Sequence, residues 1–136
     1  DRLQSEGVPK RVLALCRWII PVLSLILVPV MLYSAMGVSF DMGRIVCSIL
    51  GIMFIIIGNY LPKCRRNGVV GIKIPWTLSS DENWDKTHRF AGFVWIVCGA
   101  AAIVGGWIKP VVAIVALVAM ILLPVVYSGI LKHKGI

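Results

Sequence analysis

The chain has 136 residues, of which 59% are hydrophobic and only 15% are charged, and its formal net charge is +8. A soluble domain usually contains about 45–50% apolar and about 25% charged residues, and a globule of this size cannot bury the excess. The composition therefore excludes an ordinary soluble domain and predicts an integral membrane protein. The basic excess then indicates topology and contact with anionic membrane lipid, not direct binding of nucleic acid.

Residues 1–17 form a basic segment ahead of the first apolar stretch, with Arg2, Lys10, Arg11 and Arg17. We expect this segment to be cytoplasmic. The apolar run that follows it is too long for a cleavable signal peptide. Because the chain begins at Asp1 without a Met, we expect it to be cut from a longer protein.

Four apolar stretches are long enough to cross a bilayer, which requires about 20 residues. They are residues 18–36, 45–61, 90–107 and 110–131. Short links join them in pairs, and none alternates as a barrel strand would. We predict an all-α polytopic membrane protein with a transmembrane hairpin over 18–61 and a second over 90–131. A structured cytoplasmic loop, 62–89, joins the hairpins, and residues 132–136 form a C-terminal tail.

Basic residues are concentrated on one side of this topology. The N-terminal segment has four, the long loop six and the tail two, whereas each short link has one, Arg44 or Lys109. The positive-inside rule therefore predicts that both termini and residues 62–89 are cytoplasmic. The predicted spans contain no acid or Lys/Arg side chain, which argues against an ion-coupled transporter.

Small residues indicate how two of the spans pack. In the third span, Cys98, Ala102 and Gly106 recur at every fourth position, and the second span has Cys47 and Gly51, followed by Gly58. Helices in lipid associate through such small residues because their backbones can approach closely. We predict that these two faces meet in the bundle core.

The long loop ends in a helix-start pattern. Ser79 and Glu82 have the spacing of a capping box, so we predict one long helix from there through the third span. Glu82 with Lys86, and Asp85 with Arg89, have the i,i+4 spacing of ion pairs. The short apolar stretch before this helix, residues 69–76, should lie in the interface or fold back on the bundle, with Trp76 as its anchor.

Asp85 and His88 raise the alternative of a membrane-embedded enzyme acting on lipid headgroups. A single D-x-x-H pair without a third ligand or a nucleophile is a weak signal, and we predict no catalytic residue, no metal and no cofactor. A second alternative is a small-solute or peptide transporter or exporter, whose charged spans would lie in a missing N-terminal part.

The loop also contains an ordered set of motifs: GNYLPK at 58–63, Asn67, GIK at 71–73, PWTLS at 75–79 and W-x-x-THR at 84–89. This pattern resembles the signature of the Sdp immunity-protein family. The resemblance implies a multi-span protein of the bacterial cell membrane that protects its cell from a Sdp-type antimicrobial peptide toxin. It also implies signalling, in which the protein holds a cytoplasmic autorepressor at the membrane when toxin is present.

We therefore predict a non-enzymatic immunity and receptor protein. Its expected partners are membrane lipid, a peptide toxin and a cytoplasmic transcriptional repressor; an oligomeric state is not predicted. The expected functional surface combines polar groups near the interface, cations that bind anions, and tryptophans that set depth. Its residues are Asn59, Lys63, Asn67, Lys73, Trp76, Thr77, Trp84, Thr87, His88 and Arg89.

Overall fold

A computed structural model of the chain describes residues 8–68 and 70–136. Within them the elements are α1 (Lys10–Ala35), α2 (Met42–Tyr60), the 3-10 turn η1 (Leu61–Lys63), α3 (Pro75–Ser79), α4 (Asp81–Ile108) and α5 (Pro110–His133). Four of these helices are long and apolar enough to cross a membrane. The predicted all-α membrane fold is confirmed. Arg2 and Val69, named in the predicted N-terminal segment and docked stretch, lie outside the described residues.

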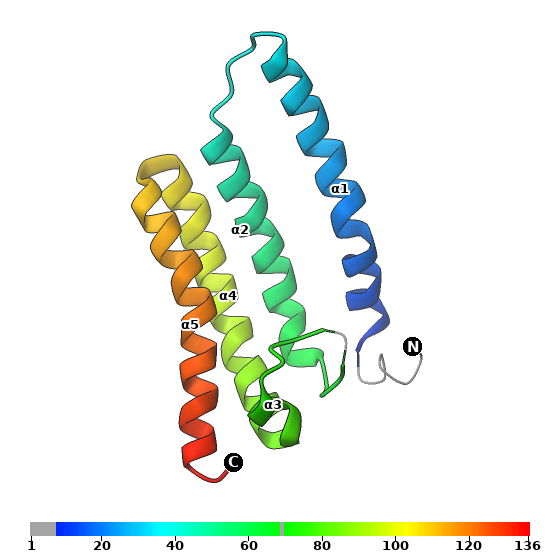
Figure 1. Cartoon of the computed structure of the whole chain (residues 1–136), viewed down its shortest axis with the longest axis vertical. Coiled ribbons are helices and arrows are strands. Elements are labelled where there is room, and N and C mark those ends of the chain that lie inside the picture. Colours follow the sequence, from blue (N-terminus) through cyan, green and yellow to red (C-terminus); the bar gives the residue numbers. More distant parts are fainter. Residues whose placement is uncertain (1–7, 69) are drawn as a thin grey trace.

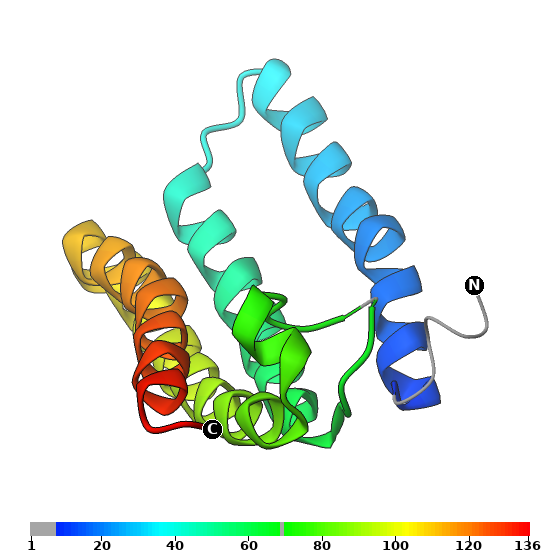
Figure 2. The ribbon, with the colours of Figure 1, turned by 60° about the horizontal axis from the view of Figure 1, so that its bottom comes forward.

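The three C-terminal long helices form the packed part of the molecule, with α4 in contact with both α2 and α5. Helix α1 stands apart from them in both views of the ribbon (Figures 1 and 2). The start of α1, η1, α3, the start of α4 and the end of α5 share one end of the molecule (Figure 1). We call this end the base.

Helices α2 and α4 meet through three pairs of small residues: Gly51 with Gly99, Gly58 with Gly92, and Cys47 with Gly106. A Cβ added to Gly51 would lie 2.6 Å from the Gly99 carbonyl oxygen, so the two backbones touch. The predicted contact between the second and third spans is confirmed for Cys47, Gly51, Gly58 and Gly106, and it also includes Gly92 and Gly99. That Cys98 and Ala102 belong to it stays a prediction. The glycines of α4 that face α2 recur every seven residues, two helical turns.

Helix α5 packs on the other side of α4. The Trp95 Nε1–H donates to the Met120 carbonyl at 3.1 Å, and the rings of Phe90 and Tyr127 stack at 4.4 Å. A Cβ on Gly105 would lie 2.5 Å from the next helix's backbone nitrogen, in the tight turn between the helices. Helix α4 is therefore the central helix, with ten buried residues.

The predicted start of α4 was wrong by one residue. Ser80, not Ser79, is the N-cap, and its hydroxyl accepts from the Asn83 N–H at 3.2 Å. Ser79 is the last residue of α3 and its hydroxyl donates to the Trp76 carbonyl instead. An N-cap needs extended backbone, and Ser80, between the two helices, is the residue with φ −138° and ψ 120°.

One of the two predicted ion pairs of this helix start is present. The Lys86 Nζ lies 2.7 Å from the Glu82 carboxylate. No Asp85–Arg89 ion pair occurs among the residues that the structure describes, and the prediction of that pair was wrong. The two predicted partners are both exposed, where an ion pair gains little over hydration.

Candidate functional site

The candidate site is a loop docked on the first turns of α4 at the base. We define the docked loop as residues 64–68 and 70–80. The centre of the site is the fully buried Trp84 of α4, whose indole N–H donates to the Cys64 carbonyl of the loop at 3.0 Å. The His88 ring stacks on Trp84, with centroids 4.1 Å apart and planes 17° from parallel. Two side chains one helical turn apart thus form a platform for the loop.

Hydrogen bonds fix the protonation state of His88. Its Nε2 accepts from the Ile72 backbone N–H at 3.0 Å, and its Nδ1 lies 2.8 Å from the Trp84 carbonyl. A carbonyl can only accept, so the proton is on Nδ1 and the ring is neutral. Burial lowers the pKa of His88 and outweighs the opposing effects of the Trp84 carbonyl and Asp85. The residue precedes the apolar stretch 90–107 and so lies outside the membrane span.

Gly71 is where the loop backbone touches this platform. Its φ is +136°, which side chains rarely adopt. An added Cβ would lie 2.5 Å from the His88 Nε2 and 2.7 Å from a Trp84 ring carbon. Only glycine fits this position on both grounds.

Thr77 shapes the loop from inside α3. Its hydroxyl is fully buried, accepts from the Ile74 N–H at 3.0 Å and lies 2.7 Å from the Ile72 carbonyl, to which it donates. Ile72 is the residue whose N–H binds His88. Thr77 therefore supports the backbone that the histidine holds.

Asn67 closes the first turn of the loop. Its amide donates to the carbonyls of Arg65 and Val70 at 2.7 and 3.1 Å, and its oxygen accepts from the Val70 N–H at 2.8 Å. Lys73 is exposed, and its Nζ donates to the Gly68 carbonyl at 3.1 Å. Both predicted residues thus bind loop backbone.

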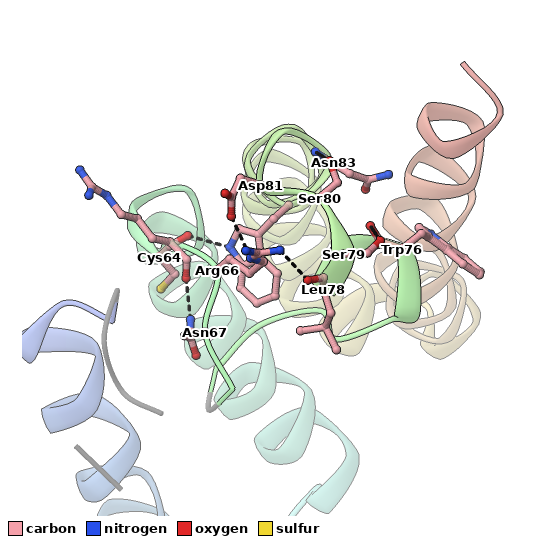
Figure 3. Close-up of polar contacts among 11 residues, drawn as sticks. Cys64, Arg66, Asn67, Trp76, Leu78, Ser79, Ser80, Asp81 and Asn83 are labelled. Atoms are coloured by element: carbon pink, nitrogen blue, oxygen red, sulfur yellow. Dashed lines mark hydrogen bonds and ion pairs between the residues drawn. The ribbon is translucent and has the colours of Figure 1, made fainter. Parts of the chain in front are cut away.

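Arg66 links the two ends of the docked loop (Figure 3). Its Nε lies 2.8 Å from the Asp81 carboxylate, and its Nη1 donates to the Leu78 carbonyl at 2.8 Å. Sequence reasoning counted Arg66 as one of the six basic residues of the long loop and missed this role. No local pattern signals it, because its partners are 12 and 15 residues away.

A second polar cluster, also missed, joins α4 to α5. The Asn83 side-chain oxygen accepts from the hydroxyls of Thr87 at 3.0 Å and Ser128 at 2.8 Å, and all three side chains are fully buried. The Asn83 amide reaches the Ser128 and Ile136 carbonyls, both at 3.3 Å. The i,i+4 spacing of Asn83 and Thr87 could have indicated their hydrogen bond. No local pattern indicates the contact with Ser128, which is 45 residues from Asn83.

The ten predicted site residues divide by exposure and do not form one surface. Trp76 is half-buried, points toward α5 (Figure 3), and has the Lys132 ammonium 4.9 Å from its ring centroid. The Lys63 ammonium similarly lies 5.0 Å from the Tyr60 ring. Buried in the base are Asn67, Thr77, Trp84, Thr87 and His88; exposed are Asn59, Lys63, Lys73 and Arg89.

The geometry bears on the enzyme alternative. Both nitrogens of His88 are engaged in hydrogen bonds, whereas Asp85 is exposed. The pair therefore has no free nitrogen for a metal or a proton transfer. Residues 8–68 and 70–136 contain no group of three or more His, Cys, Asp or Glu side chains able to hold a metal ion.

The comparisons with known proteins point to the same segment. The model of the SdpI/YfhL protein family matches residues 63–128, from the start of the docked loop into α5. This segment, 66 of the 136 residues, is similar to the SdpI/YfhL family. The protein called Immunity protein SdpI, from Bacillus subtilis (strain 168), is 28% identical over 102 residues, which are 75% of this chain and 49% of that protein.

The chain spans about half the length of this SdpI relative. No solved structure matches this chain. The family resemblance drawn from the loop motifs is thus confirmed. The structure adds that four of the five motifs make contacts of the docked loop with α4 or within itself, through Asn67, Gly71, Thr77 and Trp84.

Proposed function

We propose that this chain is the membrane part of a bacterial immunity protein that gives resistance to a Sdp-type antimicrobial peptide toxin. The observation that carries the proposal is the 102-residue match to an immunity protein. The family match begins at the docked loop. We infer that this loop is the part of the protein through which immunity or signalling operates.

The charge distribution supports a cytoplasmic base. The base contains four exposed cations: Lys63, Arg65, Lys73 and Arg89. At the other end, Arg44 pairs with Asp41 at 3.0 Å. Short loops on the cytoplasmic side of a membrane carry an excess of Lys and Arg, so the base would face the cell interior.

This orientation suggests how a signal could pass to a cytoplasmic repressor. Trp84 and His88 lie in the first turns of α4, ahead of its apolar stretch, and they hold the loop through Cys64 and Ile72. A toxin that tilts α4 would therefore move the loop with it. The exposed cations of the loop would then be presented differently to a soluble partner, here proposed to be an autorepressor.

Protection is tested by expressing the full-length protein in a bacterium sensitive to a Sdp-type peptide and measuring survival. We expect the unmodified protein to protect and Gly71→Ala, which undocks the loop, to lose protection at an equal amount in the membrane. Gly129→Ala is the matched control, because an added Cβ there meets nothing within 4 Å. Full protection by Gly71→Ala with an undocked loop would contradict the role of the loop.

Signalling is tested separately with charge reversal at exposed positions. Lys73→Glu with Arg89→Glu should release a fluorescently tagged repressor from the membrane while leaving protection intact. Lys109→Glu, in the opposite link, is the control. A repressor that stays at the membrane in the double variant would exclude this surface.

Sidedness is tested with single cysteines in a background without the four native ones. A membrane-impermeant maleimide applied outside intact cells should label Ser39→Cys, in the α1–α2 link, and spare Ser79→Cys. Both positions are exposed. The reverse result would place the base outside the cell.

A further inference from the structure

An apolar slot separates α1 from α2. Two cavities of about 320 and 260 Å³ lie there, and Leu15, Ile19 and Ile57 line both of them. Of the residues of α1, only Val12 is buried. It packs near the base against Cys64. Helix α1 is thus attached to the rest of the molecule at its start and leaves a continuous slot beyond.

The lining of the slot indicates its occupant. Both cavities are lined mainly by aliphatic and aromatic side chains, most of them from α1 and α2. An apolar surface without a packing partner forfeits dispersion contacts. An extended hydrocarbon chain is narrow and apolar enough to restore them.

Two basic residues neighbour the residues that line the base end of the slot. Tyr60 and Cys64 line the lower cavity. The Lys63 ammonium lies 5.0 Å from the Tyr60 ring, and the exposed Arg65 directly follows Cys64. The three ion pairs in the described part of the chain use Arg44, Arg66 and Lys86, so acids there do not neutralise these two cations.

We propose that the slot binds one anionic phospholipid from the leaflet on the side of the base. An acyl chain lies between α1 and α2, against Leu15, Ile19 and Ile57. The phosphate lies at Lys63 and Arg65, since guanidinium and ammonium groups both bind phosphate oxygens. The bound lipid would act as the packing partner that α1 lacks, independently of the proposed immunity function.

Native mass spectrometry of the full chain in mild detergent tests this site. With phosphatidylglycerol we expect one retained lipid per chain, at least fivefold more than with phosphatidylcholine. Ile19→Trp fills the slot and should abolish retention. Ile20→Trp, on the same helix but lining neither cavity, should leave it unchanged. Equal retention of the two lipids, or equal retention by the two Trp variants, would overturn the proposal.

The cations are tested in the same assay. Lys63→Gln with Arg65→Gln should reduce phosphatidylglycerol retention to the level of phosphatidylcholine, and Lys109→Gln should not. Circular dichroism checks that each variant is folded.

A photo-reactive phosphatidylglycerol on the unmodified chain gives an answer even if a variant fails to fold. Adducts concentrated at residues 12–19 and 54–60 would support the slot. Adducts spread evenly over α1 and α5 would overturn it, as would a cross-link of Ile19→benzoylphenylalanine to a second polypeptide in place of lipid.

Discussion

Helices α1 and α4 have similar lengths, 26 and 28 residues, and both contain a window apolar enough to cross a membrane. Yet α4 has ten buried residues and α1 has one. The difference follows their composition. Helix α4 carries Gly92, Gly99 and Gly105 where neighbouring helices approach, whereas α1 contains no glycine and exposes large aliphatic side chains.

The comparison separates entry into the membrane from association inside it. Lipid tails are as apolar as leucine, so hydrophobicity moves a helix into the bilayer but gives it no reason to contact another helix. Close approach of backbones and buried hydrogen bonds provide that reason. Helix α4 has both: glycine contacts with α2, and the Asn83–Ser128 hydrogen bonds with α5.

The most damaging change should be at the contact of α2 with α4. Gly51→Ala would place a Cβ 2.6 Å from the Gly99 carbonyl oxygen, and a methyl group forced against backbone costs about 3 kcal/mol or more. Thermal unfolding in detergent micelles measures the loss. The control Gly129→Ala, in open space, should be neutral or stabilising by up to about 1 kcal/mol. Equal effects of the two changes would refute glycine-driven packing.

The second effect concerns the docked loop. Gly71→Ala combines φ strain with a Cβ 2.5 Å from the His88 Nε2, and we expect a local loss of about 2–3 kcal/mol. Hydrogen exchange of residues 64–80 should accelerate while that of α2 and α5 does not change. Gly135→Ala also has a positive φ, +81°, but open space around its Cβ, so it reports backbone strain without a clash, at about 1–2 kcal/mol.

The third effect is a pH dependence. The pKa of His88 is lowered from its ordinary value of 6.5, chiefly by burial, so the undocked state binds the proton more readily. Docking is therefore fully stable above about pH 6.5 and weakens below it, by at most about 1.4 kcal/mol per pH unit for one proton. Hydrogen exchange of Ile72 between pH 7.5 and 5 measures this. His133→Gln, at the exposed histidine, should retain the pH dependence, and His88→Gln should remove it.

The smallest effect should be on α1. Leu25 is 74% exposed, and Leu25→Ala should change the unfolding free energy of the protein by no more than about 0.5 kcal/mol. Leu131→Ala, at a 6% exposed position of α5, is the matched truncation and should cost about 2 kcal/mol. A loss at Leu25 as large as that at Leu131 would show that α1 is packed against protein there.

Features that depend on local sequence were predictable. Apolar length placed the four spans within a few residues of α1, α2, α4 and α5, apart from the polar starts of α1 and α4. The Cys47, Gly51 and Gly58 spacing identified the face of α2 that contacts α4. The ordered motifs of residues 58–89 indicated the family whose model matches residues 63–128. Hydropathy and helical spacing are properties of neighbouring residues, so the sequence alone contains them.

Features that depend on contacts between distant residues were decided only by the tertiary structure. Trp84, Thr87 and His88 were predicted as parts of a surface, yet all three are buried. The loop binds Trp84 and His88, whereas Thr87 lies in the Asn83 cluster between α4 and α5. The tautomer of His88 depends on an N–H donor 16 residues away, and the Asn83 cluster on a hydroxyl 45 residues away. Such partners come into contact only once the helices have packed against one another in a defined register. In lipid that register is set by the fit of small residues and buried polar groups, which the hydropathy of a single segment does not specify.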